Sequence, residues 1–440
     1  MTAREAQEEE EDYTKNDVQW VYQVGSPFPS VWFGGCPWHS DVPTLRSHNI
    51  INYSSAYFGW QLMNAVPAPV GGCHHEETLL REQTTAVKAM APEVKTLAYI
   101  GNGANALCFY DAQNELCQNP TKFSGFFLPE QAAVAAGAKQ DSGRVDSGRV
   151  KGGVNQRSAI IGGAAANCPT SKLTFDFRNI SMVDFFVNSI VGPWAADNVT
   201  DSVFIDEGDS IAMFGHPGLP TLEDRYKWSN GSVDAYRRSA ALLAKNGKRL
   251  VVSLKNGFRG AAPIASKFPP CIVPLDDFVA GMQGVPFIRF HEYWGALSTL
   301  DNTGGESKIN GSTMCHNLIR TAQREAATPG MAFSGHAGDY WNHYPSVQKA
   351  SLDFGFALFM LARNATAGGE IDFFGWSTGA PPGNYWNSAA WHWNDTAALY
   401  TKRYGEPKGL ATVRGDVWTR VYDETTFTVD CANLTATAGK

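Results

Sequence analysis

Short apolar runs rich in β-branched and aromatic residues alternate along the chain with longer segments of helical periodicity, from about Val18 onward. Eight such runs predict strands, at residues 30–34, 50–54, 96–100, 203–206, 250–254, 287–292, 331–334 and 371–375. This order is typical of βα units around a parallel sheet, and eight strands are the number that closes a (β/α)8 TIM barrel. We therefore predict an α/β fold of that type.

Three helices are predicted with clear physical marks between these runs. Residues 76–90 carry apolar side chains at helical spacing, and residues 232–245 end at Asn246-Gly247, a stop signal for a helix. Residues 346–363 begin just after Pro345. Right-handed βα crossovers would place these helices outside the strands.

The flanks of the barrel differ from it in pattern. Residues 1–17 are polar and acidic, and we expect them to be disordered. The barrel is predicted over 18–405, with an insertion at about 118–170 that contains the tandem repeat 141–150. Apolar and polar residues alternate at 417–422 and 426–429, which predicts a hairpin and a small C-terminal β element over 406–440.

Composition excludes several classes of function. With 43% hydrophobic residues, a chain of 440 residues can bury a large core. Its net charge of -7, with no basic cluster interleaved with aromatics, argues against nucleic acid as a partner. No apolar run reaches the roughly 18 residues that span a bilayer, so no membrane span is expected. The oligomeric state stays open.

Sequons and cysteines indicate the secretory pathway. The pattern Asn-x-Ser/Thr occurs eight times, at Asn52, Asn179, Asn198, Asn230, Asn310, Asn364, Asn394 and Asn433. Eight cysteines are compatible with disulfides, for which Cys36 with Cys73 and Cys108 with Cys117 are possible pairs. The amino terminus has no apolar region of the kind a signal peptide needs. We expect a secreted or lumenal glycoprotein whose signal peptide is not in this chain; an intracellular protein is the alternative.

Acidic residues end two of the predicted strands. The fourth strand ends in Asp206 and Glu207, and the sixth in His291 and Glu292. In a closed barrel these strands are next-but-one neighbours, so their carboxylates can face each other at the roughly 5–10 Å that glycoside hydrolysis uses. We assign Asp206 as nucleophile or base and Glu292 as proton donor, with Glu207 as second choice for either role. The alternatives are that Asp206 and Glu207 cap a helix or hold a loop, and that Glu292 pairs with Arg289.

Aromatic and polar residues after the strand ends predict a sugar-binding cleft. Aromatic faces stack on sugar rings, and this chain has 13 Trp and 15 Tyr, although core packing is the usual fate of a single Trp. Predicted substrate-binding residues are Trp32, Trp60, Tyr293, Trp294, Trp341 and Trp376, together with the polar Lys255, Asn256, His291, His336 and Asp339. The run 73–77 has two His and two Glu but lacks metal-ligand spacing, so we predict no metal and no cofactor.

Four segments carry a resemblance to a known superfamily. They are Phe-Asp-Phe-Arg-Asn at 175–179, the acid-tipped strand at 201–207, the strand at 369–376, and Tyr-Gly-Glu-Pro at 404–407. The chain resembles the (β/α)8 glycoside hydrolases, in particular poorly characterised glycosidase families of that fold. The resemblance implies an acid on the fourth strand, here Asp206 or Glu207, and we add Asp176 to the predicted substrate-binding residues.

The predicted function is hydrolysis of O-glycosidic bonds in a polysaccharide or glycoconjugate by two carboxylates, with a carbohydrate substrate as the partner. A non-catalytic carbohydrate-binding barrel would use the same aromatics and leave the glycan intact. A polysaccharide lyase, which would need a Tyr or Lys base, is a third alternative.

Overall fold

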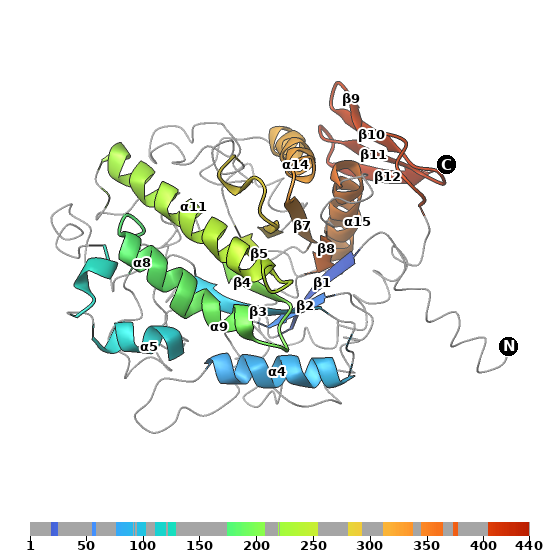
Figure 1. Ribbon diagram of the computed structural model, residues 1–440. Helices are drawn as coiled ribbons and strands as arrows, with labels where there is room; N and C mark the ends of the chain where they lie inside the picture. Colours follow the sequence, from blue (N-terminus) through green and yellow to red (C-terminus); the bar gives the residue numbers. More distant parts are fainter. Residues whose placement is uncertain are drawn as a thin grey trace.

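The core of the chain is a closed barrel of eight parallel strands in sequence order (Figure 1). The computed structural model describes residues 19–24, 55–58, 76–90, 92, 95–102, 111–119, 122–128, 174–206, 219, 221–253, 280–292, 311–337, 345–363, 373–376 and 404–439. Strand β1 pairs with both β2 and β8, which closes the sheet. The strands are β1 Gln19–Val24, β2 Ser55–Phe58, β3 Lys95–Asn102, β4 Ser202–Asp206, β5 Arg249–Ser253, β6 Phe287–Glu292, β7 Met331–Ala337 and β8 Phe373–Trp376.

The first strand of the barrel is not the one predicted. Strands β3 to β8 overlap the runs predicted from the sequence, but the closing strand is Gln19–Val24, so the assignment of 30–34 as the first barrel strand is wrong. The run Gln-Trp-Val-Tyr-Gln-Val has Gln at its first and fifth positions and is less continuously apolar than the chosen run. Strand β2 directly follows the predicted range 50–54. Residues 30–34 and 50–54 themselves lie outside the described part of the chain.

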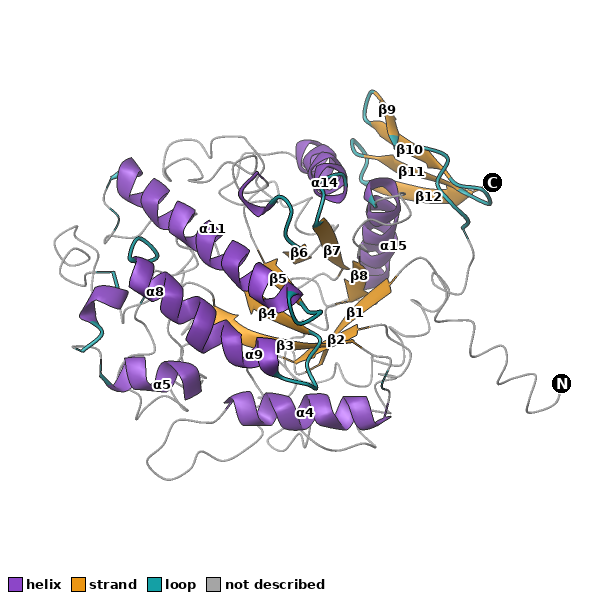
Figure 2. Cartoon of the chain, viewed as in Figure 1, coloured by secondary structure: helices purple, strands orange, loops and turns teal. Residues whose placement is uncertain are grey.

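The main described helices lie in the connections after β2, β3, β4, β6 and β7 (Figure 2), and residues 280–282, after β5, are helical as well. The main helices are α4 Glu76–Met90, α5 Asp111–Gln118, the 3-10 helix η4 Ser124–Phe126, α8 Ile180–Phe185, the π-helix η5 Phe186–Val191, α9 Gly192–Ala196, α11 Leu222–Ala244, α14 Gly311–Ala326 and α15 Pro345–Ala362.

The predicted helices are present, and one begins earlier than expected. Helix α4 has the predicted bounds, and α15 begins and ends one residue before them. Helix α11 begins ten residues before the predicted start because Thr221 and Asp224 form a capping box there. It ends where Gly247 takes a φ of 70°, as the Asn-Gly stop signal predicts.

Strands β4 to β7 have buried side chains on both of their faces. One set of positions packs outward against the helices: Phe333 of β7 contacts Phe359 of α15 at a centroid distance of 5.4 Å, and Arg289 of β6 forms a buried ion pair with Glu325 of α14. The alternate positions face the barrel interior. One interior row is buried and continuous through the strand register: Phe204, Val251, Ile288 and Ala332. This alternation tells inward from outward positions along each strand.

A four-stranded antiparallel sheet follows the barrel. It has the order β12-β11-β10-β9, formed by β9 Thr412–Arg414, β10 Val417–Val421, β11 Thr426–Asp430 and β12 Thr435–Gly439. The two strands predicted at 417–422 and 426–429 pair as β10 and β11. The sheet packs on α15, where the Phe427 ring lies 6.0 Å from Phe356 and 5.1 Å from Tyr404 (Figure 1).

A disulfide between Cys315 of α14 and Cys431, just after β11, joins this sheet to the barrel covalently. Both cysteines are fully buried. The two cysteine pairs considered from the sequence each include a residue outside the described ranges. A cross-link that closes a loop of 116 residues reduces the conformational entropy of the unfolded chain.

Arg420 of β10 fixes the sheet to the end of helix α15. Its guanidinium is 1% exposed and donates to the carbonyl oxygens of Met360, Leu361 and Arg363 at 3.1, 3.2 and 2.6 Å. These carbonyls are acceptors that the last turn of a helix leaves unpaired, and they carry the negative end of its dipole. The hydroxyl of Tyr422 also donates to Met360, at 2.6 Å. The sheet therefore acts as a C-terminal cap for α15.

We expect Arg420→Lys to lower the free energy of unfolding by about 2–4 kcal/mol, because an ammonium group cannot reach all the carbonyls that the planar guanidinium binds and stays buried. Urea unfolding at neutral pH would measure this loss. Arg414→Lys on the neighbouring strand is the control, since Arg414 is exposed and its replacement should stay within about 0.5 kcal/mol. Equal stabilities of the two variants would contradict the capping role.

Candidate active site at the carboxyl end of the barrel

Asp206 and Glu292 occupy interior positions at the carboxyl ends of their strands. Asp206 is two residues beyond Phe204 on β4, and Glu292 is four residues beyond Ile288 on β6. Phe204 and Ile288 belong to the buried interior row, and an even step along a strand returns to the same face. By register, both acidic positions therefore fall on the interior side, at the end of the barrel where active sites of this fold lie.

Two further polar positions lie next to these acids in the register. His336 of β7 pairs with Glu292, so this predicted binding residue shares its level and its face. Asn102 of β3 pairs with Asp206, because a bulge between Tyr99 and Asn102 shifts the register there. Bulges are over-represented beside active sites, where they redirect a side chain.

Asn102 is not among the site residues predicted from the sequence. The predicted strand ended at residue 100, whereas β3 continues to Asn102. The local pattern Tyr-Ile-Gly-Asn-Gly gives no sign that the strand goes on, since two glycines flank the asparagine. Only the pairing with β4 identifies this position as a neighbour of Asp206.

Two predicted binding residues fall at positions of the opposite face. His291 is two residues beyond Arg289, whose side chain points outward to Glu325. Trp376 pairs with Ala337, an odd step from Ala332. Arg289 forms an ion pair with Glu325, and positions 289 and 292 lie on opposite faces of β6. Both observations argue against the alternative in which Arg289 pairs with Glu292.

The remaining predicted site residues, apart from Asp176, lie outside the described part of the chain. These are Glu207, Trp32, Trp60, Lys255, Asn256, Tyr293, Trp294, Asp339 and Trp341. Their assignments stay predictions.

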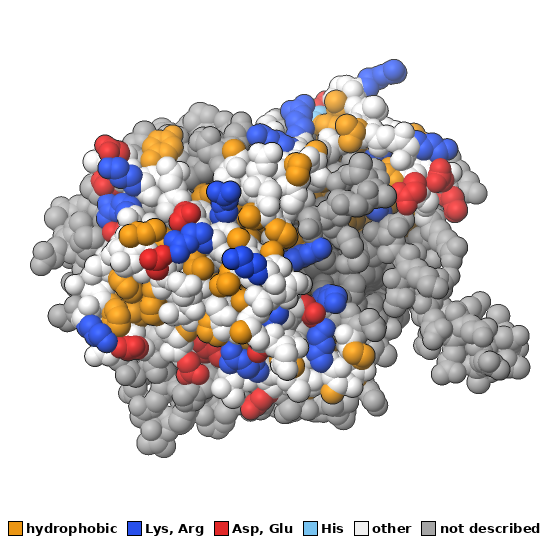
Figure 3. Space-filling model, viewed as in Figure 1, with side chains coloured by type: hydrophobic (Ala, Val, Ile, Leu, Met, Phe, Trp, Pro, Cys, Tyr) orange, Lys and Arg blue, Asp and Glu red, His pale blue; other side chains and the backbone are white. Residues whose placement is uncertain are grey.

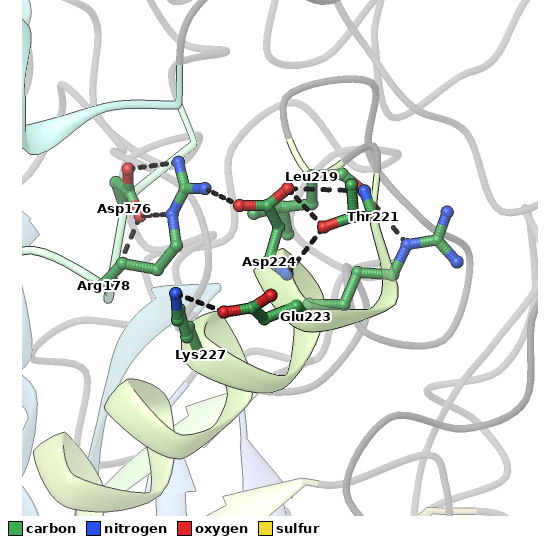
Figure 4. A network of polar contacts seen from close by, with 8 residues as sticks. Asp176, Arg178, Leu219, Thr221, Glu223, Asp224 and Lys227 are labelled. Carbon is green, nitrogen blue, oxygen red and sulfur yellow. Dashed lines mark hydrogen bonds and ion pairs between the residues drawn. The ribbon is translucent and has the colours of Figure 1, made fainter.

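Asp176 is engaged in an ion-pair network that Figure 4 shows. Arg178 donates to both of its carboxylate oxygens, each at 2.8 Å, and reaches Asp224 of α11 at 2.9 Å. The hydroxyl of Thr221 donates to Asp224 at 2.6 Å and, together with Arg178, lowers the pKa of that carboxyl. Hydrogen bonds from the guanidinium to Asp176 raise the pKa of Arg178. Asp176 thus holds the start of α11 against the segment before α8.

The same segment is packed tightly on α11. The indole of Trp228 donates to the carbonyl of Phe175 at 2.8 Å, and the Phe177 ring lies 5.4 Å from Trp228. A Cβ atom at Gly231 would lie 1.8 Å from the Phe177 carbonyl oxygen, so only glycine allows this approach. The residues that carried the family resemblance at 175–179 therefore form a rigid scaffold in the described structure.

A buried carboxylate, Glu77 of α4, caps helix α5. It is 6% exposed and accepts from the backbone N–H groups of Asp111 at 2.7 Å and Ala112 at 3.1 Å. Burial raises the pKa of Glu77, although the two backbone hydrogen bonds act in the opposite direction. A raised carboxyl pKa is one mark of a catalytic acid, but both oxygens of Glu77 serve the helix start.

The described surface on the face shown in Figure 3 has no field of one sign. On the face in Figure 3, basic and acidic side chains are interspersed over α4, α8 and α11. Within the described ranges, no group of three or more His, Cys, Asp or Glu residues is arranged to hold a metal ion. No helix in those ranges is long and apolar enough to cross a membrane.

No family model and no curated protein matches this chain. Solved structures with a similar fold include a debranching enzyme from Nostoc punctiforme, at 10% identity and a TM-score of 0.49, covering 94% of this chain and 89% of that one. Cyclic alpha-maltosyl-(1→6)-maltose hydrolase from Arthrobacter globiformis has 11% identity and a TM-score of 0.48, with coverages of 94% and 91%. Alpha-L-fucosidase isoenzyme 2 from Paenibacillus thiaminolyticus has 13% identity and a TM-score of 0.44, with coverages of 87% and 50%. These likenesses concern overall fold and carry no argument about chemistry.

We expect Glu77→Gln to change how stability depends on pH. The folded-state pKa of Glu77 is raised, so its contribution is fully present below the ordinary value of 4.5 and is lost as pH rises through the raised pKa. The advantage of the wild type over Glu77→Gln should therefore shrink as pH rises from acid toward neutral. Urea unfolding at a series of pH values measures it. Glu82→Gln, an exposed change on the same helix, is the control, and parallel curves for wild type and Glu77→Gln would refute the prediction.

Proposed function

We propose that this chain is a glycoside hydrolase with a complete (β/α)8 barrel, in which Asp206 and Glu292 perform the chemistry. The observation that carries the proposal is the register of β4 and β6, which assigns both acidic positions to the interior side at the carboxyl end of the barrel. Only β5 lies between these strands, and adjacent strands are about 4.8 Å apart. A sugar ring bound at this mouth would lie between the two acids.

In the proposed reaction, Glu292 donates its proton to the glycosidic oxygen as the bond to the anomeric carbon breaks. Asp206, ionised, either attacks the anomeric carbon or removes a proton from the attacking water. In both cases water supplies the hydroxyl of the new reducing end. The partner positions support these roles, because Asn102 lies opposite Asp206 and His336 opposite Glu292, where an amide and an imidazole can hydrogen-bond a carboxyl or a sugar hydroxyl.

The proposed substrate is a polysaccharide or glycoconjugate, and the proposed location is the secretory pathway or the extracellular space. The buried disulfide Cys315–Cys431 supports an oxidising compartment, because such bonds are rare in the cytosol. The aromatic residues predicted after the strand ends would supply the stacking faces of the cleft.

The test is release of reducing ends from a panel of plant, algal and fungal polysaccharides by wild type, Asp206→Asn and Glu292→Gln. We expect each variant to lose about 10²–10⁴-fold in kcat, the usual contribution of a general acid or base, with an unchanged melting temperature. Glu223→Gln is the matched control, because Glu223 is an exposed carboxylate paired with Lys227 on the outside of α11 and its loss should leave kcat unchanged.

Three outcomes would decide against the proposal. Full activity in both Asp206→Asn and Glu292→Gln would refute the assignment of the acids. Glycan binding by wild type without turnover would favour the non-catalytic carbohydrate-binding barrel. Products that absorb in the ultraviolet, from a new carbon–carbon double bond, would identify a lyase.

A further inference from the structure

Four of the eight sequons have their asparagine in the described part of the chain, and three of these asparagines are exposed. Asn198 lies in the turn between α9 and β4, Asn230 on α11, and Asn433 in the turn between β11 and β12. The fourth, Asn179, is half-buried. Asn52, Asn310, Asn364 and Asn394 lie outside the described residues. We propose that Asn198, Asn230 and Asn433 carry N-linked glycans and that Asn179 does not.

Asn179 differs because both ends of its amide hold the fold together. Its Oδ1 accepts from the backbone N–H of Ser181 at 2.9 Å and caps α8. Its Nδ2 donates to the carbonyl of Gly125 at 2.6 Å, in the separate segment 122–128. A glycan on Nδ2 would have to be accommodated beside this segment, on a residue that is half-buried. These contacts between distant segments disfavour a glycan at Asn179.

Asn433 shows how a sequon can keep its local contacts and still carry a glycan. Its Nδ2 donates to Asp430 at 2.7 Å, and the backbone N–H of Asn433 donates to the same side chain at 3.0 Å. An amide nitrogen has two hydrogens, so one can remain on Asp430 when the other is replaced. Thr435, the third residue of the sequon, is exposed as well.

The modification needs an activated sugar donor, an oligosaccharide linked to a polyprenyl diphosphate. A bond forms between Nδ2 and the anomeric carbon of the first sugar, and the bond from that carbon to the diphosphate oxygen breaks. The amide loses one proton, and the lipid diphosphate leaves. This occurs in the lumen of the secretory pathway, where the disulfide Cys315–Cys431 would also form.

Two of the three proposed glycans lie away from the carboxyl end of the barrel. Asn198 precedes β4 and so lies by the amino end of the barrel. Asn433 belongs to the C-terminal sheet, on the far side of α15 from the barrel (Figure 1). The inference rests on the proposed location in the secretory pathway and on the exposure and contacts of the sequon asparagines, and it does not depend on the proposed hydrolase activity.

The experiment is expression of the full chain behind a secretion signal in a eukaryotic cell. Enzymatic removal of the glycans in water labelled with heavy oxygen converts each glycosylated Asn to a labelled Asp, which mass spectrometry of peptides locates. We expect label at Asn198, Asn230 and Asn433, and unlabelled Asn at Asn179. Replacing any of the three by Gln should remove one glycan from the intact mass, and Asn179→Gln should remove none.

Thr435→Ala provides a second variant for Asn433, because it destroys the sequon and keeps the bond from Asn433 to Asp430. Loss of one glycan in Thr435→Ala supports the assignment even if Asn433→Gln fails to fold. Two results would overturn the proposal. One is labelling of Asn179 to the same extent as the exposed sites, and the other is a secreted chain that carries no glycan at Asn198, Asn230 or Asn433.

Discussion

The alternation of side chains along the barrel strands is the constraint on which the rest of the structure depends. Each central strand buries an inner and an outer face, so its residues divide into two sets with different partners. Val251 and Ile288 fill the interior, whereas Val252 and Phe333 pack against helices. A shift of one residue in β4 would exchange the two sets and turn Asp206 toward the helices. The packing of the core thus determines which acids belong to the mouth of the barrel.

The two ends of the barrel use polar residues differently. Near the amino ends of the strands, polar groups are paired within the protein: the buried Lys248 donates to the carbonyl of Trp194 at 2.6 Å, and Asp201 accepts from the backbone of Thr96 at 2.8 Å and pairs with Lys88 at 2.6 Å. Burial lowers the pKa of Lys248. At the carboxyl ends, polar positions such as Asp206 and Glu292 continue the interior rows beyond the apolar layer. The same division is general in enzymes of this fold, in which the amino ends of the strands serve stability and the carboxyl ends carry the active site.

The sequence predicts the parts of this structure that depend on local pattern. Strands β3 to β8 and helix α4 follow from apolar runs, periodicity and end signals. Strand β1 does not, because its place is decided by pairing with β8, some 350 residues away. The same holds for the bulge that brings Asn102 opposite Asp206 and for the disulfide between residues 116 apart. Candidate acids could be chosen from the ends of the predicted strands. The residues next to them on the adjacent strands could be identified only from the strand register.

The contacts of Asp176 show that a residue singled out by a sequence motif can have a structural role. Arg178 lies between Asp176 and Asp224 and so joins the connection that follows β3 to the helix that follows β4. Because Gly231 lets Phe177 approach α11 closely, these two connections pack as one unit. Residues 207–221 connect the end of β4 to the start of α11, and this unit fixes the start of α11. Arg178 and Gly231 therefore hold the start of α11 in its place relative to the connection before β4.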